Sequence, residues 1–410
     1  MNTHVPGRFS YSILAQVCKL IPPHAVPKLA REYHADGQWR RFDPWSHVVT
    51  WIQAHLSHAI GLNDVCDALE MNSGPLSAIR GATPPHRNTL SHANKIRNAD
   101  MAESLYWLML EHLMKQDSGF AKGPGRRGYV KRFKRTIHVL DSTTIQLVAN
   151  CMDWAQHRRR KAAAKCHLRL DLQSFLPRCA IIDTAKHHDN TKAHELCVDL
   201  RSGEIVIFDK AYLDFDHLWE LRGRGVFWVT RAKGNMKCEV VERLQTTRDP
   251  RILSDELIRL TGVETRQSYP DVLRRIVAIV EVNGKPMKLT FLSDNMEWSA
   301  WSIAELYRCR WDIEVFFKEM KQTLQLADFF GYNENAIRWQ IWTGLLVHLL
   351  LRYIAYVHSW GHSFIRLFTV LRAAMWKRWN LDDLIILYGT ARPPPRMCGA
   401  PEQAYLPGFA

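Results

Sequence analysis

Four polar residues between positions 302 and 324 recur at the spacing of one helix face. Tyr307, Arg310, Glu314 and Lys321 are three, four and seven residues apart. At about 100° of rotation per residue, all four fall within an arc of about 60°. An apolar set lies beside them: Leu306, Ile313, Phe317, Met320 and Leu324. The pattern predicts one helix that buries the apolar stripe and carries a phenol, a guanidinium, a carboxylate and an ammonium on its shoulder. The alternative is an ordinary solvated face.

Two further acids follow segments with the composition of strands. Asp141 ends the segment 136–141, and Asp209 ends the segment 204–209. Functional side chains gather at the carboxyl ends of strands in α/β sheets. Together with Glu314, these acids would suit two hard divalent cations in a phosphoryl-transfer site, with Asp141 as the shared ligand. The chain has 41 acidic residues, so position alone does not single out these three.

The elements that must position these acids form a predicted mixed α/β sheet. Strand-like segments alternate with helix-like segments near 191–201 and 214–222, and the strands are expected at 136–141, 167–172, 178–183, 204–209 and 226–231. The segment 272–292 predicts two further strands joined at Asn283-Gly284, a strong hairpin signal. Residues 234–298 therefore form a predicted β-rich insertion. The helix that follows is expected to begin with a capping box made by Ser302 and Glu305.

The first 110 residues have helical periodicity and contain one candidate for DNA reading. Pro84-Pro85 leads into a helix whose exposed side chains should be Arg87, Asn88, Ser91, His92, Asn94, Lys95 and Arg97. Arginine and asparagine read guanine and adenine edges in a major groove, and the others suit phosphates. A helix-turn-helix-like module with this stretch as its recognition helix is one interpretation. An ordinary polar surface helix is the other.

Composition favours a polyanionic partner. The 410 residues carry a formal charge of +14, which most often signifies nucleic acid binding in a globular protein. The segment 116–135 is a predicted basic linker with no acid after Asp117. The alternative is a generally basic protein without such a partner.

Other features argue against a secreted, disulfide-bonded or membrane protein. Nine scattered cysteines without a C-x-x-C pair indicate reduced thiols in a cytosol. The N-terminus lacks a signal-peptide pattern. The apolar run 341–357 contains His348 and Arg352 and is predicted to be a buried core helix. A possible zinc cluster around 187–195 lacks regular ligand spacing, so a polar loop is the preferred interpretation.

The motifs in this order resemble those of one protein family. The Tyr307, Arg310, Glu314 and Lys321 spacing is similar to the signature of the YREK group of insertion-sequence DDE transposases. VLDSTTI at 139–145 resembles the first-aspartate motif, IFDKAY at 207–212 the second, and FWVTRAK at 227–233 the strand with a DNA-contacting arginine. The resemblance covers roughly residues 9–390.

The resemblance implies a fold and its ligands. An RNase H-like core, split by the β-rich insertion, would follow an all-helical N-terminal DNA-binding domain. Two Mg²⁺ or Mn²⁺ ions would be held by Asp141, Asp209 and Glu314. The phosphates of the transposon ends would be held by Tyr307, Arg310 and Lys321, and by Arg231. The expected divisions are 1–115 (DNA binding), 116–135 (linker), 136–233 and 299–357 (catalytic), 234–298 (insertion) and 358–410 (C-terminal helices and tail).

The function implied is DNA transposition in the bacterial cytoplasm, at the nucleoid when DNA is bound. The protein would bind terminal inverted repeats, cleave the element's ends and join the 3′-hydroxyl to target DNA. Double-stranded DNA and a second copy of the chain would be its partners, with no membrane. Two alternatives remain: a metal-dependent nuclease without strand transfer, and an inactive transposase-derived DNA-binding protein.

Two motif departures bear on the mechanism. The second motif is Asp209-Lys210-Ala211-Tyr212 where relatives have a form such as Asp-Arg-Gly-Tyr. The last strand of the insertion lacks the tryptophan that some relatives use to stack a flipped base. Phe291 and Trp298 are the possible substitutes.

Overall fold

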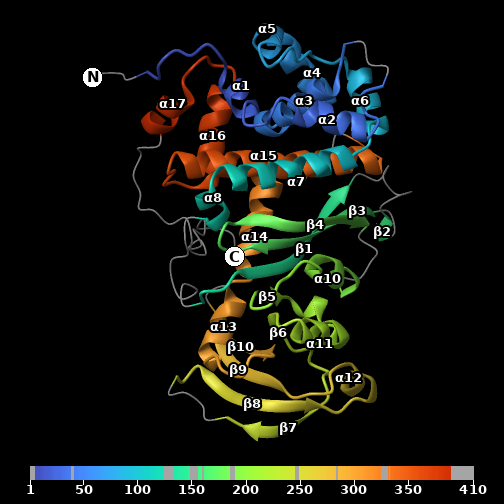
Figure 1. Cartoon of the computed structure of the whole chain (residues 1–410), viewed down its shortest axis with the longest axis vertical. Helices are drawn as coiled ribbons and strands as arrows, with labels where there is room; N and C mark the ends of the chain where they lie inside the picture. Colours follow the sequence, from blue (N-terminus) through green and yellow to red (C-terminus); the bar gives the residue numbers. More distant parts are fainter. Residues whose placement is uncertain are drawn as a thin grey trace. The chain divides into compact units, whose positions relative to one another are not determined.

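The computed structural model places most of the chain in two compact units (Figure 1). The helical unit comprises residues 1–124, 145–164 and 317–399, and the sheet unit comprises 125–144, 165–316 and 400–410. The structure describes residues 5–37, 41–123, 133–147, 156–158, 161–184, 190–244, 249–282, 285–324, 331 and 333–388.

The helical unit combines helices from the first 124 residues with helices from residues 317–399. Its helices are α1 (Ile13–Cys18), α2 (Ala25–Glu32), α3 (Pro44–Ser57), α4 (Leu62–Met71), α5 (Ser73–Ser77), α6 (Arg87–Ile96), α7 (Asp100–Gln116), α8 (Ser118–Lys122), η4 (Glu319–Thr323), α15 (Glu334–Val357), α16 (Phe364–Ala374) and α17 (Leu381–Tyr388). The long helices α7 and α15 lie side by side (Figure 1). Helix α16 packs on α3 and α15 and contacts α17. Helix α8 also lies inside the predicted linker, of which 124–132 fall outside the described residues.

Helix α15 contains the most apolar run of the sequence. It is long and apolar enough to cross a membrane, but 83% of its most apolar window is buried inside the protein. Burial of this kind is expected for the central helix of a bundle, because an apolar surface on every side needs neighbours on every side. The core-helix interpretation of 341–357 agrees with this burial.

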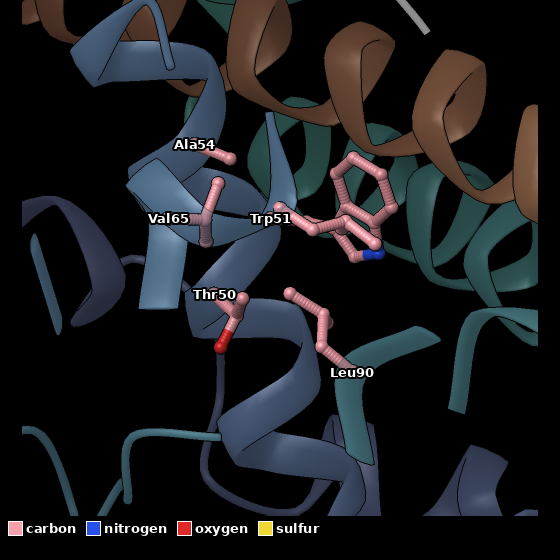
Figure 2. Close-up of a pocket in the computed structure, with 6 residues that line it drawn as sticks. Thr50, Trp51, Ala54, Val65 and Leu90 are labelled. Atoms are coloured by element: carbon pink, nitrogen blue, oxygen red, sulfur yellow. The ribbon is translucent and has the colours of Figure 1, made fainter. Parts of the chain in front are cut away.

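A tight apolar seam fixes α6 against α3 and α4. Figure 2 shows Thr50, Trp51 and Ala54 of α3 facing Val65 and Leu90, and Leu62 completes the lining. The space between these side chains leaves no room for a water molecule. The seam is therefore packing between helices and offers no ligand site.

The strands form one mixed sheet, most of which lies in the sheet unit. Its strands are β1 (Ile137–Leu147), β2 (Gln156–Arg158), β3 (Lys161–Asp171), β4 (Leu176–Thr184), β5 (Ile205–Phe208), β6 (Phe227–Arg231), β7 (Cys238–Arg243), β8 (Ile252–Leu260), β9 (Leu273–Val282) and β10 (Lys285–Ser293). Their order is β2-β3-β1-β5-β6-β10-β9-β8-β7, and β4 pairs with β3. Strands β1, β5 and β6 are parallel.

The strands of the predicted insertion extend this same sheet. Strand β10 pairs antiparallel with β6, with Phe291 opposite Arg231, and on its other side with β9. Strands β9 and β10 confirm the predicted hairpin, whose Asn283-Gly284 turn lies outside the described residues. The sheet therefore runs without a break from β4 to β7 (Figure 1).

Helices cover the sheet on both faces. Successive residues of a strand point to opposite faces. Leu292 of β10 belongs to an apolar core with α10 (Asn190–Cys197) and α11 (Phe215–Gly223). The preceding Phe291 contacts Tyr307 on α13 (Ala300–Arg308). A short helix, α12 (Val263–Ser268), packs on β8.

The helix predicted over 302–324 is interrupted. Helix α13 ends at Arg308, α14 (Trp311–Lys318) follows after a tight turn, and η4 is a π-helical turn. At the turn, the amide of Arg310 donates to the carbonyl of Tyr307 at 3.0 Å, an i to i−3 bond. The predicted capping box is also wrong. The cap is Ser299, whose Oγ accepts from the amide of Ser302 at 3.2 Å.

Candidate functional site

The two strand-end acids lie on neighbouring parallel strands. The β1–β5 register pairs Leu140 with Phe208, so Asp141 and Asp209 are the next residues on their strands. Asp209 follows β5 directly and caps the short helix η3 (Lys210–Tyr212), accepting from the amide of Ala211 at 3.3 Å. Strand β1 continues beyond Asp141 to Leu147, so this acid does not end its strand as predicted. Asp141 directly follows Leu140, which pairs with Phe208 of β5.

Arg310 gathers the three predicted acids around one guanidinium. It donates to Asp141 Oδ2 at 2.5 Å and to Glu314 Oε1 at 2.9 Å, and its Nε lies 4.0 Å from Asp209 Oδ2. Only 9% of the Arg310 side chain is exposed. Arg310 lies at the turn that interrupts the helix, and Glu314 lies four positions farther along the chain, on α14. The structure thus brings together Asp141, Asp209 and Glu314, all within the sheet unit.

The electrostatics of this cluster favour an added cation. The pKa of Asp141 is raised to about 6, chiefly by burial; the negative charges of Asp209 and Glu314 add to the rise, and Arg310 opposes it. Burial alone would lower the pKa of Arg310, but the surrounding acids leave it raised. Three carboxylates share one positive charge. A hard divalent cation with oxygen ligands therefore fits the donor set.

Tyr307 presents a buried hydroxyl beside the acids. The residue is 3% exposed, its ring lies 5.1 Å from that of Phe291, and its hydroxyl has no hydrogen-bond partner of standard geometry among the described residues. Burial and the charge of Asp209 raise its pKa to about 12. An unpaired buried hydroxyl is unfavourable, so this group is available to a ligand's oxygen.

The remaining sequence candidates have different environments. Arg231 ends β6 and is partly buried, close enough to Tyr307 to act on its pKa. Phe291 is fully buried against Tyr307, so it offers no free face for a base. Trp298 is half-buried, with its ring 5.0 Å from Phe133 and 5.1 Å from Phe227. Lys321 belongs to the helical unit, on η4, and its role remains a prediction.

The predicted recognition helix is exposed in part. Arg87, Asn88, Ser91, His92 and Lys95 are exposed on α6, as expected, whereas Asn94 and Arg97 are 2% exposed. The prediction for these two residues is wrong because each bonds inside the bundle. Asn94 contacts His47 Nε2 at 2.7 Å. Arg97 donates to the carbonyls of Phe42 and Asp43.

A buried ion pair that sequence patterns did not predict holds the segment just before α13. Arg274 of β9 pairs with Asp255 of β8 through two hydrogen bonds of 2.8 and 2.6 Å, and both side chains are at most 5% exposed. The same guanidinium donates to the carbonyls of Asn295 and Trp298. It therefore fixes the segment that leads to Tyr307. Only the sheet register reveals this pair, because 19 residues separate the two in sequence.

Comparisons with known proteins match two parts of this chain to protein families. Residues 132–350 match the family described as Transposase DDE domain, and residues 10–79 match a family described as Domain of unknown function (DUF4372). The y4zB protein of Sinorhizobium fredii, named as a transposase, is 28% identical over 63% of this chain and 70% of its own length. A Geobacillus stearothermophilus protein named as a transposase for insertion sequence element IS5377 is 27% identical over 54% of this chain and 58% of its own.

One further relative and one solved structure are also similar to this chain. Transposase InsG for insertion sequence element IS4 of Escherichia coli is 25% identical over 45% of this chain and 42% of its own. These alignments thus span between 42% and 70% of the three relatives' own lengths. A solved piggyBac transposase synaptic complex with hairpin DNA has a TM-score of 0.44 at 8% identity, covering 91% of this chain and 82% of that chain. That score is too low to indicate a shared fold.

Proposed function

Since the chain belongs to the Transposase DDE domain family, we propose that it is a DNA transposase of the YREK group. It binds the terminal inverted repeats of an insertion sequence, hydrolyses a strand at each end and joins the freed 3′-hydroxyl to target DNA. The observation that supports this most strongly is the convergence of Asp141, Asp209 and Glu314 on Arg310. Synapsis of two ends requires two copies of the site, so the DNA complex is a homodimer in the bacterial cytoplasm.

The catalytic core of this proposal is RNase H-like. Strand order β4-β3-β1-β5-β6, with β1, β5 and β6 parallel, supports it. Asp209 directly follows its strand, and Asp141 follows the part of β1 that pairs with β5, at the edge where α/β sheets collect functional groups. Residues 136–233 and 299–357 supply this core, and 234–298 extend its sheet.

Asp141, Asp209 and Glu314 would hold two Mg²⁺ or Mn²⁺ ions. When bound, such ions activate the attacking oxygen and stabilise the leaving oxygen of an in-line displacement. The carboxylates supply the negative charge that such cations require. Glu314, whose side chain is 53% exposed, is the acid best placed to adjust as ligands arrive.

Arg310, Tyr307, Lys321 and Arg231 hold the phosphates of the transposon ends. Arginine binds a phosphate through two parallel hydrogen bonds, and lysine acts as a point charge. Arg310 must exchange its carboxylate partners for phosphate oxygens as the acids take up cations. The unpaired hydroxyl of Tyr307 supports a donor role.

Metal dependence and product analysis test this function. The full-length protein is incubated with duplex DNA that carries the inverted repeats flanking its gene, with Mg²⁺ or with EDTA. We expect nicked ends bearing 3′-hydroxyls and products joined to a second DNA with Mg²⁺, and neither with EDTA. Cleavage without any joined product would favour the nuclease alternative. End binding without cleavage in Mg²⁺ or Mn²⁺ would favour the inactive DNA-binding protein.

The exposed face of α6 gives a separate prediction about end binding. Arg87→Ala and Lys95→Ala should each weaken binding to the inverted repeats. Each should also reduce the slope of log Kd against log salt concentration by about 1, because one phosphate contact is lost. The control is Glu70→Ala, an exposed acid on α4, which should not reduce affinity. Fluorescence anisotropy at several salt concentrations measures both quantities. Unchanged affinity and slope in both variants would assign α6 to an ordinary solvated surface.

A further inference from the structure

Helices α10 and α11 bring three metal-ligand side chains together away from the acid cluster. His194 lies on α10, and His217 and Glu220 lie one turn apart on α11. His194 Nδ1 is 3.3 Å from Glu220 Oε2, and His217 Nδ1 is 3.9 Å from the same oxygen. One ligand atom from each residue lies within 4.8 Å of the other two. The cluster is formed by the fold, because 23 positions separate the two histidines.

His217 is a buried group beside Glu220. It is 1% exposed, and among the described residues neither of its ring nitrogens has a hydrogen-bond partner. Leaving such a nitrogen unpaired is unfavourable.

We propose that His194, His217 and Glu220 bind Zn²⁺, with a water molecule as the fourth ligand. Zinc takes histidine nitrogens and carboxylate oxygens at about 2.0–2.2 Å in a tetrahedron, which sets ligand atoms about 3.3 Å apart. The 3.3 and 3.9 Å separations in the protein are close to that value. Small side-chain movements would bring all three atoms onto one ion.

The ligand types distinguish this site from the acid cluster. Two imidazoles with one carboxylate suit zinc, whereas all-oxygen sets suit Mg²⁺ or Mn²⁺. Arg224 lies 3.4 Å from Glu220 Oε1, which leaves Oε2 for the ion and orients the carboxylate. Of the cluster suggested by sequence around 187–195, residues 187–189 lie outside the described residues. The partners of His194 are instead on α11.

A zinc ion here would tie α10 to α11. Both helices pack on the core that includes Leu140 and Phe208, the residues directly before Asp141 and Asp209. The ion would therefore stabilise the layer that supports these two acids. Anything that binds only the folded state raises its melting temperature.

Zinc titration of the full-length chain, purified without a histidine tag and stripped of metal, tests the site. Isothermal calorimetry should show one Zn²⁺ bound with micromolar or tighter affinity, and the melting temperature should rise with Zn²⁺. Co²⁺ should give the visible absorption of a tetrahedral site with nitrogen ligands. His194→Gln and Glu220→Gln, whose side chains are about half exposed, should keep the fold and weaken Zn²⁺ binding at least tenfold.

Two controls separate the possible outcomes. His92→Gln removes an exposed histidine on α6 and should leave Zn²⁺ binding unchanged. Asp141→Asn should also leave it unchanged, which excludes binding at the acid cluster. Zinc affinity that is equal in the wild type, His194→Gln and Glu220→Gln would overturn the proposal. So would the absence of any Zn²⁺-dependent rise in melting temperature.

Discussion

Asp141→Asn abolishes cleavage of the element's ends while end binding is retained. The expected loss is about a thousandfold or more, equivalent to about 4 kcal/mol of transition-state stabilisation. Asparagine keeps the size of the side chain but removes the negative charge that the proposed cations require. It also replaces a carboxylate whose charged form is disfavoured by burial, as its raised pKa of about 6 indicates. The fold should therefore not be destabilised. Gel assays of cleavage and anisotropy of end binding measure the two properties separately.

Further variants sharpen this result. Glu314→Gln should behave like Asp141→Asn, and Asp67→Asn, an exposed acid on α4, should cleave normally. Circular dichroism checks that each variant is folded. Wild-type cleavage by Asp141→Asn in Mg²⁺ would refute the catalytic assignment. Loss of binding and cleavage together in a folded Asp141→Asn would show that this acid acts in DNA binding instead.

Asp255→Ala should lower the free energy of unfolding of the sheet unit by about 3–5 kcal/mol. The change leaves the guanidinium of Arg274 buried without its carboxylate, because both side chains are at most 5% exposed. A buried charge that loses its partner is far more unfavourable than the pair was favourable. Urea unfolding followed by tryptophan fluorescence measures the change, since Trp228 lies in this unit's core.

An exposed pair on the adjoining strands provides the matched control. Glu239 and Arg259 lie 3.9 Å apart with side chains 57% and 39% exposed. Glu239→Ala should therefore change stability by no more than about 1 kcal/mol. Equal effects of Asp255→Ala and Glu239→Ala would show that the Arg274 pair contributes nothing beyond a surface contact.

Sequence patterns predicted local features better than the packing. The strand segment before Asp209 is a continuous apolar run, and the one before Asp141 is interrupted only by His138; such segments identify buried strands. Their register then brings the two acids together. The spacing of Arg310 and Glu314 predicted that they share a face, and they bond to each other at 2.9 Å. These properties are local, so a single sequence can show them.

The errors concern long-range packing. Periodicity predicted an unbroken helix over 302–324, because no glycine or proline marks the turn after Arg308. The polar character of Arg97 predicted exposure, but its partners are carbonyls at positions 42 and 43. Nothing in the sequence indicated that β10 would pair with β6. Such features depend on contacts between distant residues, which residue type alone does not determine.

The pairing of β10 with β6 has a consequence for how this chain can be shortened. A domain inserted through two flexible connections can be removed, and its host closes over the gap. Here, deletion of 234–298 would strip β6 of a hydrogen-bonded neighbour and leave its buried residues, such as Trp228 and Val229, on an open edge. Open apolar edges recruit strands from other molecules. A minimal version of this protein must therefore keep β10, or replace the hydrogen bonds that β10 gives to β6.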